Sequence, residues 1–459
     1  MKMKQTHHSS TIASLLALMA CVAGVTSAFA FDSSATTASS VPLRGEIAMQ
    51  YNQPNGTAVN VGGSTEMCVP SGSVDGMQTG NQANGSLHCH SLLKQPVQLS
   101  VQLNEEKLDL PITTVGNKPL NLKGIVDTGS GGLTLNAFQI FPASMVTRKG
   151  FKFNGSNQIV YNGITVTRLV ATRDYGGETA DKTSRTGNLG FAHVTFGERG
   201  EVKTALIPIL FVYTSTKEPS ATSSDLDNTI GINGEMDPIG QQVSLDGDPI
   251  DDGSDASATV YPECTTQSTT KCSLISPLRA LSYSNDLQAG YILNSFPLVE
   301  GQKGRYLTVG LDQHDTEGFA SAQLRCITSS FDVQACNQEV PNVNVVTSAG
   351  LNSTWYAIFD SGRPTVGITV PVDNSNPPAP APLPAGQAVT VTPPNQGGYT
   401  YTFTTGTGLT ATTLTSVNPD ADGADETYSN MGLEFFGTNS LMLDYDKGIE
   451  GWKRADSSN

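Results

Sequence analysis

Residues 125–130 read Ile125-Val126-Asp127-Thr128-Gly129-Ser130, and residues 358–362 repeat the pattern as Ile358-Phe359-Asp360-Ser361-Gly362. In each segment an apolar run ends in Asp, a hydroxyl residue and Gly, which is typical of a buried strand that enters a tight turn. A single copy would fit an ordinary turn. Two copies far apart in the chain could bring two carboxylates face to face, and paired carboxylates can activate water by acid–base chemistry.

The rest of the chain indicates a β protein. Its 459 residues can bury a sizeable core, and 37% of them are apolar. Long helical periodicities are scarce, whereas residues 96–103 and 192–196 alternate between apolar and polar side chains, as half-buried strands do. We therefore expect an all-β fold built mostly from antiparallel strands.

Charge and the N-terminal residues indicate where the protein acts. The net charge of −16 argues against nucleic acid or an anionic membrane as a partner. Residues 1–30 read as a secretory signal: basic at 1–4, largely apolar from 12 to 25, and with a small-residue cleavage site at 28–30. We expect a secreted or periplasmic protein without a membrane span. A weaker alternative is lipoprotein anchoring at Cys21, because residues 18–21 loosely resemble a lipoprotein box.

Cysteine usage agrees with export. Cleavage after Ala30 would remove Cys21 and leave six cysteines, an even number that favours disulfides. They fall into three pairs that are local in sequence, and we predict the bridges Cys68–Cys89, Cys264–Cys272 and Cys326–Cys336 among fifteen possible connectivities. The sequence has no Cys-x-x-Cys pair, so zinc binding and thiol redox chemistry are not indicated.

Composition divides the chain further. Residues 31–95 are polar and predict an N-terminal extension, and strand patterning begins at Pro96. Residues 371–428, rich in Pro, Thr and Gly, predict a surface insertion with a strand-like patch at 399–403. Acidic stretches at 246–255 and 420–426 could hold Ca²⁺, but neither completes a calcium-binding loop, and solvated loops are the preferred interpretation. Likewise, His88 and His90 around Cys89 fit a polar loop better than a metal site.

From residue 96 onward the sequence resembles the pepsin-like aspartic proteases. The first motif, with residues 119–124 before it, is similar to the family's first catalytic strand and turn. The other similar segments follow in the family's order: Tyr175-Gly176-Gly177 and 186–197 as the flap hairpin and the next strand, 226–232 as the segment that threads behind the first loop, then 306–319, 432–436 and 443–452 in the second lobe.

The resemblance implies two β lobes, 96–270 and 271–459, with a cleft between them. Asp127 and Asp360 would share one proton at its floor and activate a water. Thr128 and Ser361 would brace the two loops, and Gly129, Ser130 and Gly362 would support the turns. Tyr175 and Gly176 would close over the substrate, although Tyr175 could equally be a half-exposed strand residue. The chemistry would need no metal and no organic cofactor.

The second motif departs from the family pattern. Arg363 and Pro364 follow Gly362 where active relatives usually carry Thr or Ser. The guanidinium could pair with Asp360 and stop the two carboxyls from sharing a proton, or it could point away while Thr365 supplies the hydroxyl. Asn430 and Met431, in the second threading segment, are also less apolar than the family prefers.

Two functions are therefore weighed. The first is an exported, monomeric aspartic endopeptidase that binds extended polypeptide in its cleft. The second is a catalytically silent scaffold of the same fold that binds protein or glycan; a surface adhesion module is a weaker third. The direction of Arg363 separates the first two.

Overall fold

The computed structural model describes residues 57–61, 64–70, 87–175, 183–216, 226–234, 237–238, 242–243, 249–250, 263–266, 268, 272–328, 334–374, 378–394, 398–419 and 428–455. Within 57–70 and 87–89 only the backbone is described. The expected signal sequence at 1–30, Cys21, Gly176 and the acidic stretch 420–426 lie outside these residues.

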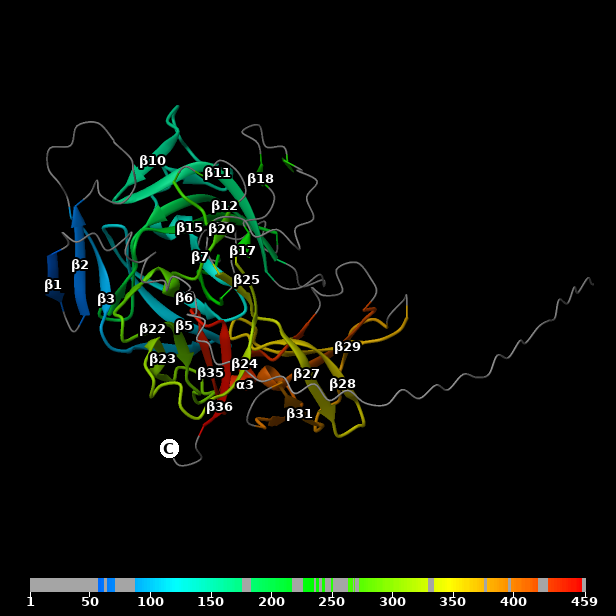
Figure 1. Ribbon diagram of the computed structural model, residues 1–459. Coiled ribbons are helices and arrows are strands. Elements are labelled where there is room, and N and C mark those ends of the chain that lie inside the picture. Colours follow the sequence, from blue (N-terminus) through cyan, green and yellow to red (C-terminus); the bar gives the residue numbers. More distant parts are fainter. Residues whose placement is uncertain are drawn as a thin grey trace, which may run out of the picture. The chain divides into compact units, whose positions relative to one another are not determined.

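The first described sheet contains both strands of the first motif. In spatial order, its path runs β10 (Gln158–Tyr161), β11 (Ile164–Tyr175), β12 (Thr183–Ala192), β15 (Ile207–Ser215), β7 (Gly131–Asn136), β16 (Thr229–Ile232), β6 (Lys118–Asp127), β5 (Lys107–Val115), β4 (Val97–Asn104), β23 (Lys303–Leu311), β22 (Gln288–Leu293), β35 (Asn439–Asp444), β36 (Ile449–Arg454) and β24 (Ala320–Gln323). Strands β13 (Val194–Phe196) and β14 (Val202–Lys203) branch from β5, giving 16 strands. Figure 1 labels most of these strands.

A second, eight-stranded sheet carries the second motif. Its order is β30 (Ala381–Pro382), β33 (Thr412–Val417), β29 (Val366–Pro371), β34 (Ser429–Asn430), β28 (Asn352–Ile358), β27 (Val340–Thr347), β31 (Ala388–Thr392) and β32 (Tyr401–Thr404). Within residues 371–428, the strands β30, β31, β32 and β33 are paired in this sheet. The strand-like patch expected at 399–403 lies largely in β32, and the description of 371–428 as an insertion stays a prediction.

Smaller elements complete the described fold. Residues 31–95 contribute β1 (Thr57–Val61), β2 (Ser64–Pro70) and β3 (Leu87–Leu93), which pair with β21 (Ser282–Tyr283). Short pairs join β8 (Val146–Thr147) to β9 (Gly150–Phe151), β17 (Asp237–Pro238) to β20 (Ser273–Leu274), β18 (Gln242–Val243) to β19 (Pro249–Ile250), and β25 (Arg325–Thr328) to β26 (Gln334–Asn337). The helical segments are α2 (Ala137–Ile140), α3 (Gly432–Phe436), η1 (Pro277–Ala280) and η2 (Gly408–Thr410). The expected all-β class with mostly antiparallel pairing is confirmed.

The two motifs are built into the same three-strand unit. In the first, β6 leads into the Asp loop, β7 leaves it, and β16 lies between them, parallel to β6 and antiparallel to β7. In the second, β28 leads in, β29 leaves, and β34 lies between them, again parallel to the first strand and antiparallel to the second. The duplication seen in the sequence is therefore a duplication of topology.

Glycine permits the close approach of the middle strand in each unit. A Cβ atom on Gly231 of β16 would lie 2.6 Å from the carbonyl oxygen of Ser130. A Cβ atom on Gly432, just after β34, would lie 2.5 Å from the carbonyl oxygen of Thr365, and Gly432 also has a φ of +49°. Only Gly fits at such positions without displacing the loop.

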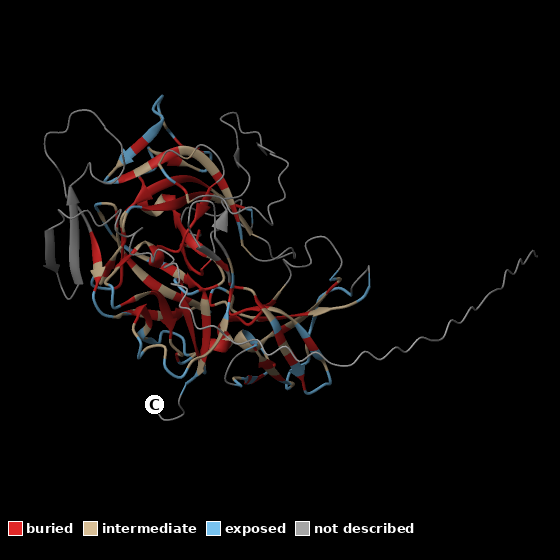
Figure 2. Ribbon diagram, viewed as in Figure 1, coloured by how far each residue is buried: buried red, intermediate tan, exposed pale blue. Residues whose placement is uncertain are grey.

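Buried residues follow the strands of both sheets, as Figure 2 shows. Every residue of β7 and of β35 is buried, which explains why these strands read as mixed runs and not as clean alternations. Beneath the second motif, the Phe359 ring packs 4.7 Å from that of Phe435 and 5.5 Å from that of Trp452, measured between ring centroids. The core thus extends directly under the loop that carries Asp360.

Two of the three predicted disulfides are confirmed, Cys264–Cys272 and Cys326–Cys336. Cys68 and Cys89 stand directly opposite each other in the β2–β3 register. Their side chains lie outside the described part, so that bridge stays a prediction. Among the described residues, no helix is long and apolar enough to span a membrane.

Candidate active site

Asp127 is the last residue of β6, and only 7% of its surface is exposed. Its Oδ1 accepts a hydrogen bond from the Gly129 backbone N–H at 2.9 Å, and its Oδ2 accepts one from the Ser130 hydroxyl at 2.6 Å. The tight turn after the strand supplies both donors. The carboxyl is therefore fixed in direction although it is almost fully removed from water.

The pKa of Asp127 is raised to about 7, chiefly by burial and next by the negative charge of Asp360. The Ser130 hydrogen bond and the positive charge of Arg173 oppose this rise. Asp127 therefore holds a proton through the acidic range, which an exposed aspartate would lose near pH 4.

Asp360 lies in the corresponding position of the second unit, two residues after β28. Its Oδ1 accepts from the Gly362 backbone N–H at 2.7 Å, as Asp127 does from Gly129. Its Oδ2 accepts from the side-chain amide of Asn430 at 2.7 Å. Asn430 comes from β34, the middle strand of the unit, and not from the loop itself.

The two carboxyls face each other across the two loops. A Cβ atom on Gly129 would lie 2.5 Å from Cγ of Asp360, and one on Gly362 would lie 2.5 Å from Oδ1 of Asp127. Each motif's glycine thus lies directly against the other motif's carboxyl. A larger residue at either position would push the carboxyls apart.

Hydroxyl groups tie the two loops together in a reciprocal pattern. The Thr128 hydroxyl donates to the Phe359 carbonyl at 2.6 Å and accepts from the Ser361 N–H at 2.8 Å. The Ser361 hydroxyl donates to the Val126 carbonyl at 2.7 Å and accepts from the Thr128 N–H at 3.2 Å. Both side chains are fully buried. These are the cross-loop hydrogen bonds that the resemblance implies for Thr128 and Ser361.

Arg363 lies beside the second motif but turns away from its carboxyl. The guanidinium is 3.1 to 3.4 Å from the place where a Cβ atom on Gly367 would be, so it lies along β29. Among the described residues, Arg363 and Asp360 form no ion pair. Asn430 holds the oxygen that, in the first motif, is held by the hydroxyl of Ser130. Neither Arg363 nor Thr365 takes that role.

Tyr175 ends β11 at the base of the predicted flap, and its hydroxyl donates to Thr134 Oγ1 on β7 at 2.8 Å. Its ring lies between two guanidinium groups, with Arg173 at 4.9 Å and Arg185 at 4.7 Å from the centroid. Arg173 also donates to Thr134 and to the carbonyl of Gly131. The Tyr175 hydroxyl is thereby tied to β7, the strand that leaves the first Asp loop.

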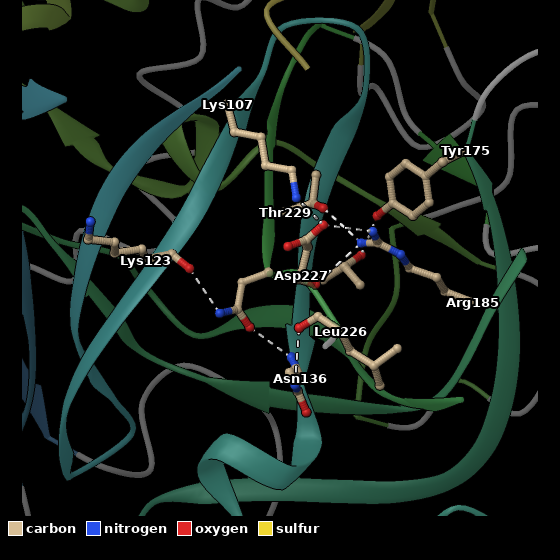
Figure 3. A network of polar contacts seen from close by, with 10 residues as sticks. Lys107, Lys123, Asn136, Tyr175, Arg185, Leu226, Asp227 and Thr229 are labelled. Carbon is tan, nitrogen blue, oxygen red and sulfur yellow. Dashed lines mark hydrogen bonds and ion pairs between the residues drawn. The ribbon is translucent and has the colours of Figure 1, made fainter. Parts of the chain in front are cut away.

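A polar network fixes the segment that threads behind the first loop (Figure 3). Asn136 donates through its side chain to the Leu226 carbonyl at 3.0 Å and through its backbone to Asn228 Oδ1 at 2.8 Å. Asn228 in turn donates to the Lys123 carbonyl at 2.9 Å. These bonds hold β16 in register with β6 and β7, the strands that carry Asp127.

The same figure shows a charged group on the other side of this segment. Lys107 donates to Asp227 at 2.9 Å, and Arg185 lies 3.8 Å from the same carboxyl oxygen while donating to Thr229 at 3.1 Å. Arg185 therefore links the base of the flap to the threading segment. Tyr175, stacked on Arg185, is held by that link.

Of the remaining candidate ligands, His90 lies in a structural contact, whereas the side chains of His88 and of 246–255 and 420–426 lie outside the described part. His90 is buried and contacts the Ser282 hydroxyl at 2.8 Å, joining β3 to β21. Within the described ranges, no group of three or more His, Cys, Asp or Glu side chains is arranged to hold a metal ion.

The sequence did not predict the roles of Asn430, Arg173 and Thr134. For Asn430 a signal existed, because an amide in an otherwise apolar buried segment needs a hydrogen-bond partner. Arg173 and Thr134 gave no local signal, since both act through strands that pair only in the folded chain.

Comparison with known proteins adds the following. No protein-family model and no curated protein sequence matches the chain. Among solved structures, the chain is similar to the aspartic proteinase from Irpex lacteus, with 15% sequence identity, a TM-score of 0.47, and coverage of 79% of this chain and 98% of that one. At this identity and TM-score the likeness carries no inference about activity.

Proposed function

We propose that the chain is an aspartic endopeptidase that hydrolyses peptide bonds with a water activated between Asp127 and Asp360. The observation that carries the proposal is the pair of facing carboxyls, each fixed by its own turn and locked to the other by the reciprocal Thr128 and Ser361 hydrogen bonds. Two unrelated turns would have no reason to exchange hydrogen bonds in this way.

The chemistry follows from a pair that holds one proton. The ionised carboxyl takes a proton from the water while the water oxygen bonds to the peptide carbonyl carbon. The protonated carboxyl gives its proton to the carbonyl oxygen. The resulting tetrahedral diol collapses when the carbon–nitrogen bond breaks: the carboxyl that took the water's proton gives it to the leaving nitrogen, and the other carboxylate takes a proton from one diol hydroxyl, which restores the starting pair. No covalent enzyme intermediate forms, and each proton passes through one of the two carboxyls.

The substrate class is unfolded or extended polypeptide, and the protein would act after export, as a monomer. The two disulfides fit an oxidising compartment. The direction of Arg363 supports the enzyme over the silent scaffold, because the guanidinium lies along β29 and leaves the Asp360 carboxyl to the N–H groups of Gly362 and Asn430.

The test is cleavage of an unfolded protein at acidic pH, followed by mass spectrometry of the products. Wild type should cut internal bonds and, in ¹⁸O-labelled water, place the label in the new carboxyl group. Asp127→Asn and Asp360→Asn preserve the side-chain shape, and each should lower the rate by at least 10³-fold because it removes a proton acceptor or donor. Equal cleavage by wild type and both variants would show that the activity does not come from this pair.

A further inference from the structure

The two aspartates are held by different chemical groups at equivalent places. The third residue after Asp127 is Ser130, whose hydroxyl bonds to its carboxyl, but the third residue after Asp360 is Arg363. Asn430 supplies the missing hydrogen bond from the neighbouring strand at 2.7 Å. The substitution of one support by another is a feature of this chain's own sequence.

Register shows where this amide comes from. Asn430 pairs with Ile358, two residues before Asp360, and Thr229 pairs with Ile125, two residues before Asp127. The two residues therefore occupy matching positions in the middle strands of the two units. The hydroxyl of Thr229 bonds to Arg185, whereas the amide of Asn430 bonds to the carboxyl.

The amide can face Asp360 in one orientation only. The backbone N–H of Gly432 donates to Asn430 Oδ1 at 3.0 Å, so the amide oxygen is engaged and the NH₂ group must point at the carboxyl. Only 5% of the Asn430 surface is exposed, and water therefore does not compete for this hydrogen bond. Asp360 consequently accepts hydrogen bonds from two N–H donors, those of Gly362 and Asn430, and neither nitrogen can accept a hydrogen bond from a protonated Asp360.

A hydroxyl behaves differently. The Ser130 hydroxyl can donate a hydrogen bond to an ionised Asp127 or rotate to accept one from a neutral Asp127, whereas an amide NH₂ can only donate. Fixed N–H donors stabilise the ionised form of the carboxyl they face. The two carboxyls are therefore supported differently. The Ser130 hydroxyl can bond to either the neutral or the ionised form of Asp127, whereas the Asn430 amide favours the ionised form of Asp360.

We propose that Asn430 is a positioning residue that assigns the roles in the pair, with Asp360 as the ionised base toward water and Asp127 as the proton-carrying acid. The inference rests on the proposed function. The charged groups that face the pair are the two carboxyls themselves and Arg173, whose positive charge acts on Asp127, while the guanidinium of Arg363 lies beside Gly367 of β29. The direction of the Asp127 pKa supports this assignment, since it is raised.

The test compares pH profiles of kcat/KM for wild type, Asn430→Leu and Asn430→Asp. Asn430→Leu removes a hydrogen-bond donor to the ionised Asp360, and this loss should move the acidic limb of the profile to higher pH by about one to two units. Asn430→Asp keeps the shape and the acceptor for Gly432, but its second negative charge should also move the acidic limb upward. The Asn430→Asp variant therefore still tests the inference if Asn430→Leu folds poorly.

Ser130→Ala is the matched variant on the other carboxyl. It removes a hydrogen bond that lowers the pKa of Asp127, so it should move the alkaline limb upward and leave the acidic limb in place. Asn344→Leu deletes an amide on β27 of the same sheet that bonds to Asn352, Ser353 and Thr354 at the start of β28, at the opposite end of that strand from Asp360, and it should leave both limbs in place. An unchanged acidic limb in both Asn430 variants would overturn the inference while leaving the proposed function intact.

A second measurement tests the role of Asn430 separately from the proposed proteolysis, and it applies even if wild type cleaves no substrate. NMR of the protein with ¹³C-labelled Asp carboxyls, assigned with Asp360→Asn, follows ionisation without substrate. If the Asp360 signal shows ionisation at a higher pH in Asn430→Leu than in wild type, this would support the role of Asn430 even if proteolysis were absent. Identical titration of that signal in the two proteins would overturn it.

Discussion

At the scale of single residues, Asp127 and Asp360 lie in turns of the same kind, yet different side chains donate hydrogen bonds to them. Asp127 has a backbone N–H and a hydroxyl, and Asp360 has a backbone N–H and an amide. The pKa of Asp127 is raised, chiefly by burial. A pair of equal residues thus becomes an unequal acid and base through its neighbours, which is how carboxylate pairs divide their tasks.

The pH dependence of activity follows from the raised pKa of Asp127, about 7. The acid must be protonated to polarise the carbonyl, so activity should be present below pH 7 and fall as the pH rises through about 7. A kcat/KM profile over pH 3 to 9 measures this. A profile that rises through pH 7 would contradict the assignment of Asp127 as the acid.

Arg363 gives a second prediction at this scale. Because its guanidinium lies along β29 beside Gly367 and not on Asp360, replacing it with Thr should change kcat/KM by less than about threefold. An increase of tenfold or more in Arg363→Thr, measured at acidic pH, would mean that the arginine suppresses the pair in solution.

Much of the site was predictable from these residues alone. The two Asp motifs carry their own turn glycines and their own cross-loop hydroxyls, so local chemistry specifies them. The direction of Arg363 was not predictable, because a long flexible side chain follows tertiary packing and not its neighbours in sequence. Asn430 was visible only as a departure from apolar patterning, and its partner is 70 positions away.

At the scale of elements, each Asp loop is held by three strands, and the Thr128 and Ser361 hydrogen bonds described above join the two units. Thr128→Val keeps the shape but removes the hydroxyl, leaving the buried Ser361 N–H without its acceptor. We expect a loss of about 1–3 kcal/mol in unfolding free energy and a large loss of activity. Urea denaturation measures the first, and peptide cleavage the second.

Thr390→Val is the control for that substitution. Thr390 also bonds to a hydroxyl, that of Thr402 at 3.0 Å, but the pair is exposed on β31 and β32. Its loss should change the unfolding free energy by less than about 0.5 kcal/mol. Equal effects of the two substitutions would contradict a special role for the cross-loop bonds.

The sequence predicted individual strands better than their partners. Alternation identified 96–103 and 192–196, which lie largely within β4, β12 and β13. It did not identify the pairing of β29 with β33 or of β27 with β31. Strand pairing depends on residues far apart in the chain, and Pro and Gly within the intervening segment conceal it.

At the scale of the whole molecule, buried acids connect stability to pH. Glu450 on β36 is fully buried, and burial raises its pKa well above the usual value, against the opposing effect of Trp452 and Gln338 beside it. Burial likewise raises the pKa of Glu434 to about 7. Such acids are neutral in the folded chain and ionise more readily in the unfolded chain, so the folded state binds more protons above about pH 4.

The free energy of unfolding should therefore be highest at acidic pH and decline as the pH rises through neutrality. Glu450→Gln, which keeps the shape without a charge, should flatten this decline, as measured by urea denaturation between pH 4 and pH 8. Glu106→Gln, in an exposed turn, should leave the decline as in wild type. A stability that increases from pH 4 to pH 8 in wild type would contradict this reasoning.

The central claim is that Asp127 and Asp360 form one hydrolytic pair, and binding of a statine-type peptide tests it most directly. Such a peptide carries a hydroxyl in place of the attacking water and binds where both carboxyls are present. Calorimetry at acidic pH should find tight binding to wild type and affinities at least 100-fold weaker for Asp127→Asn and Asp360→Asn. Equal affinity for all three proteins would contradict the account.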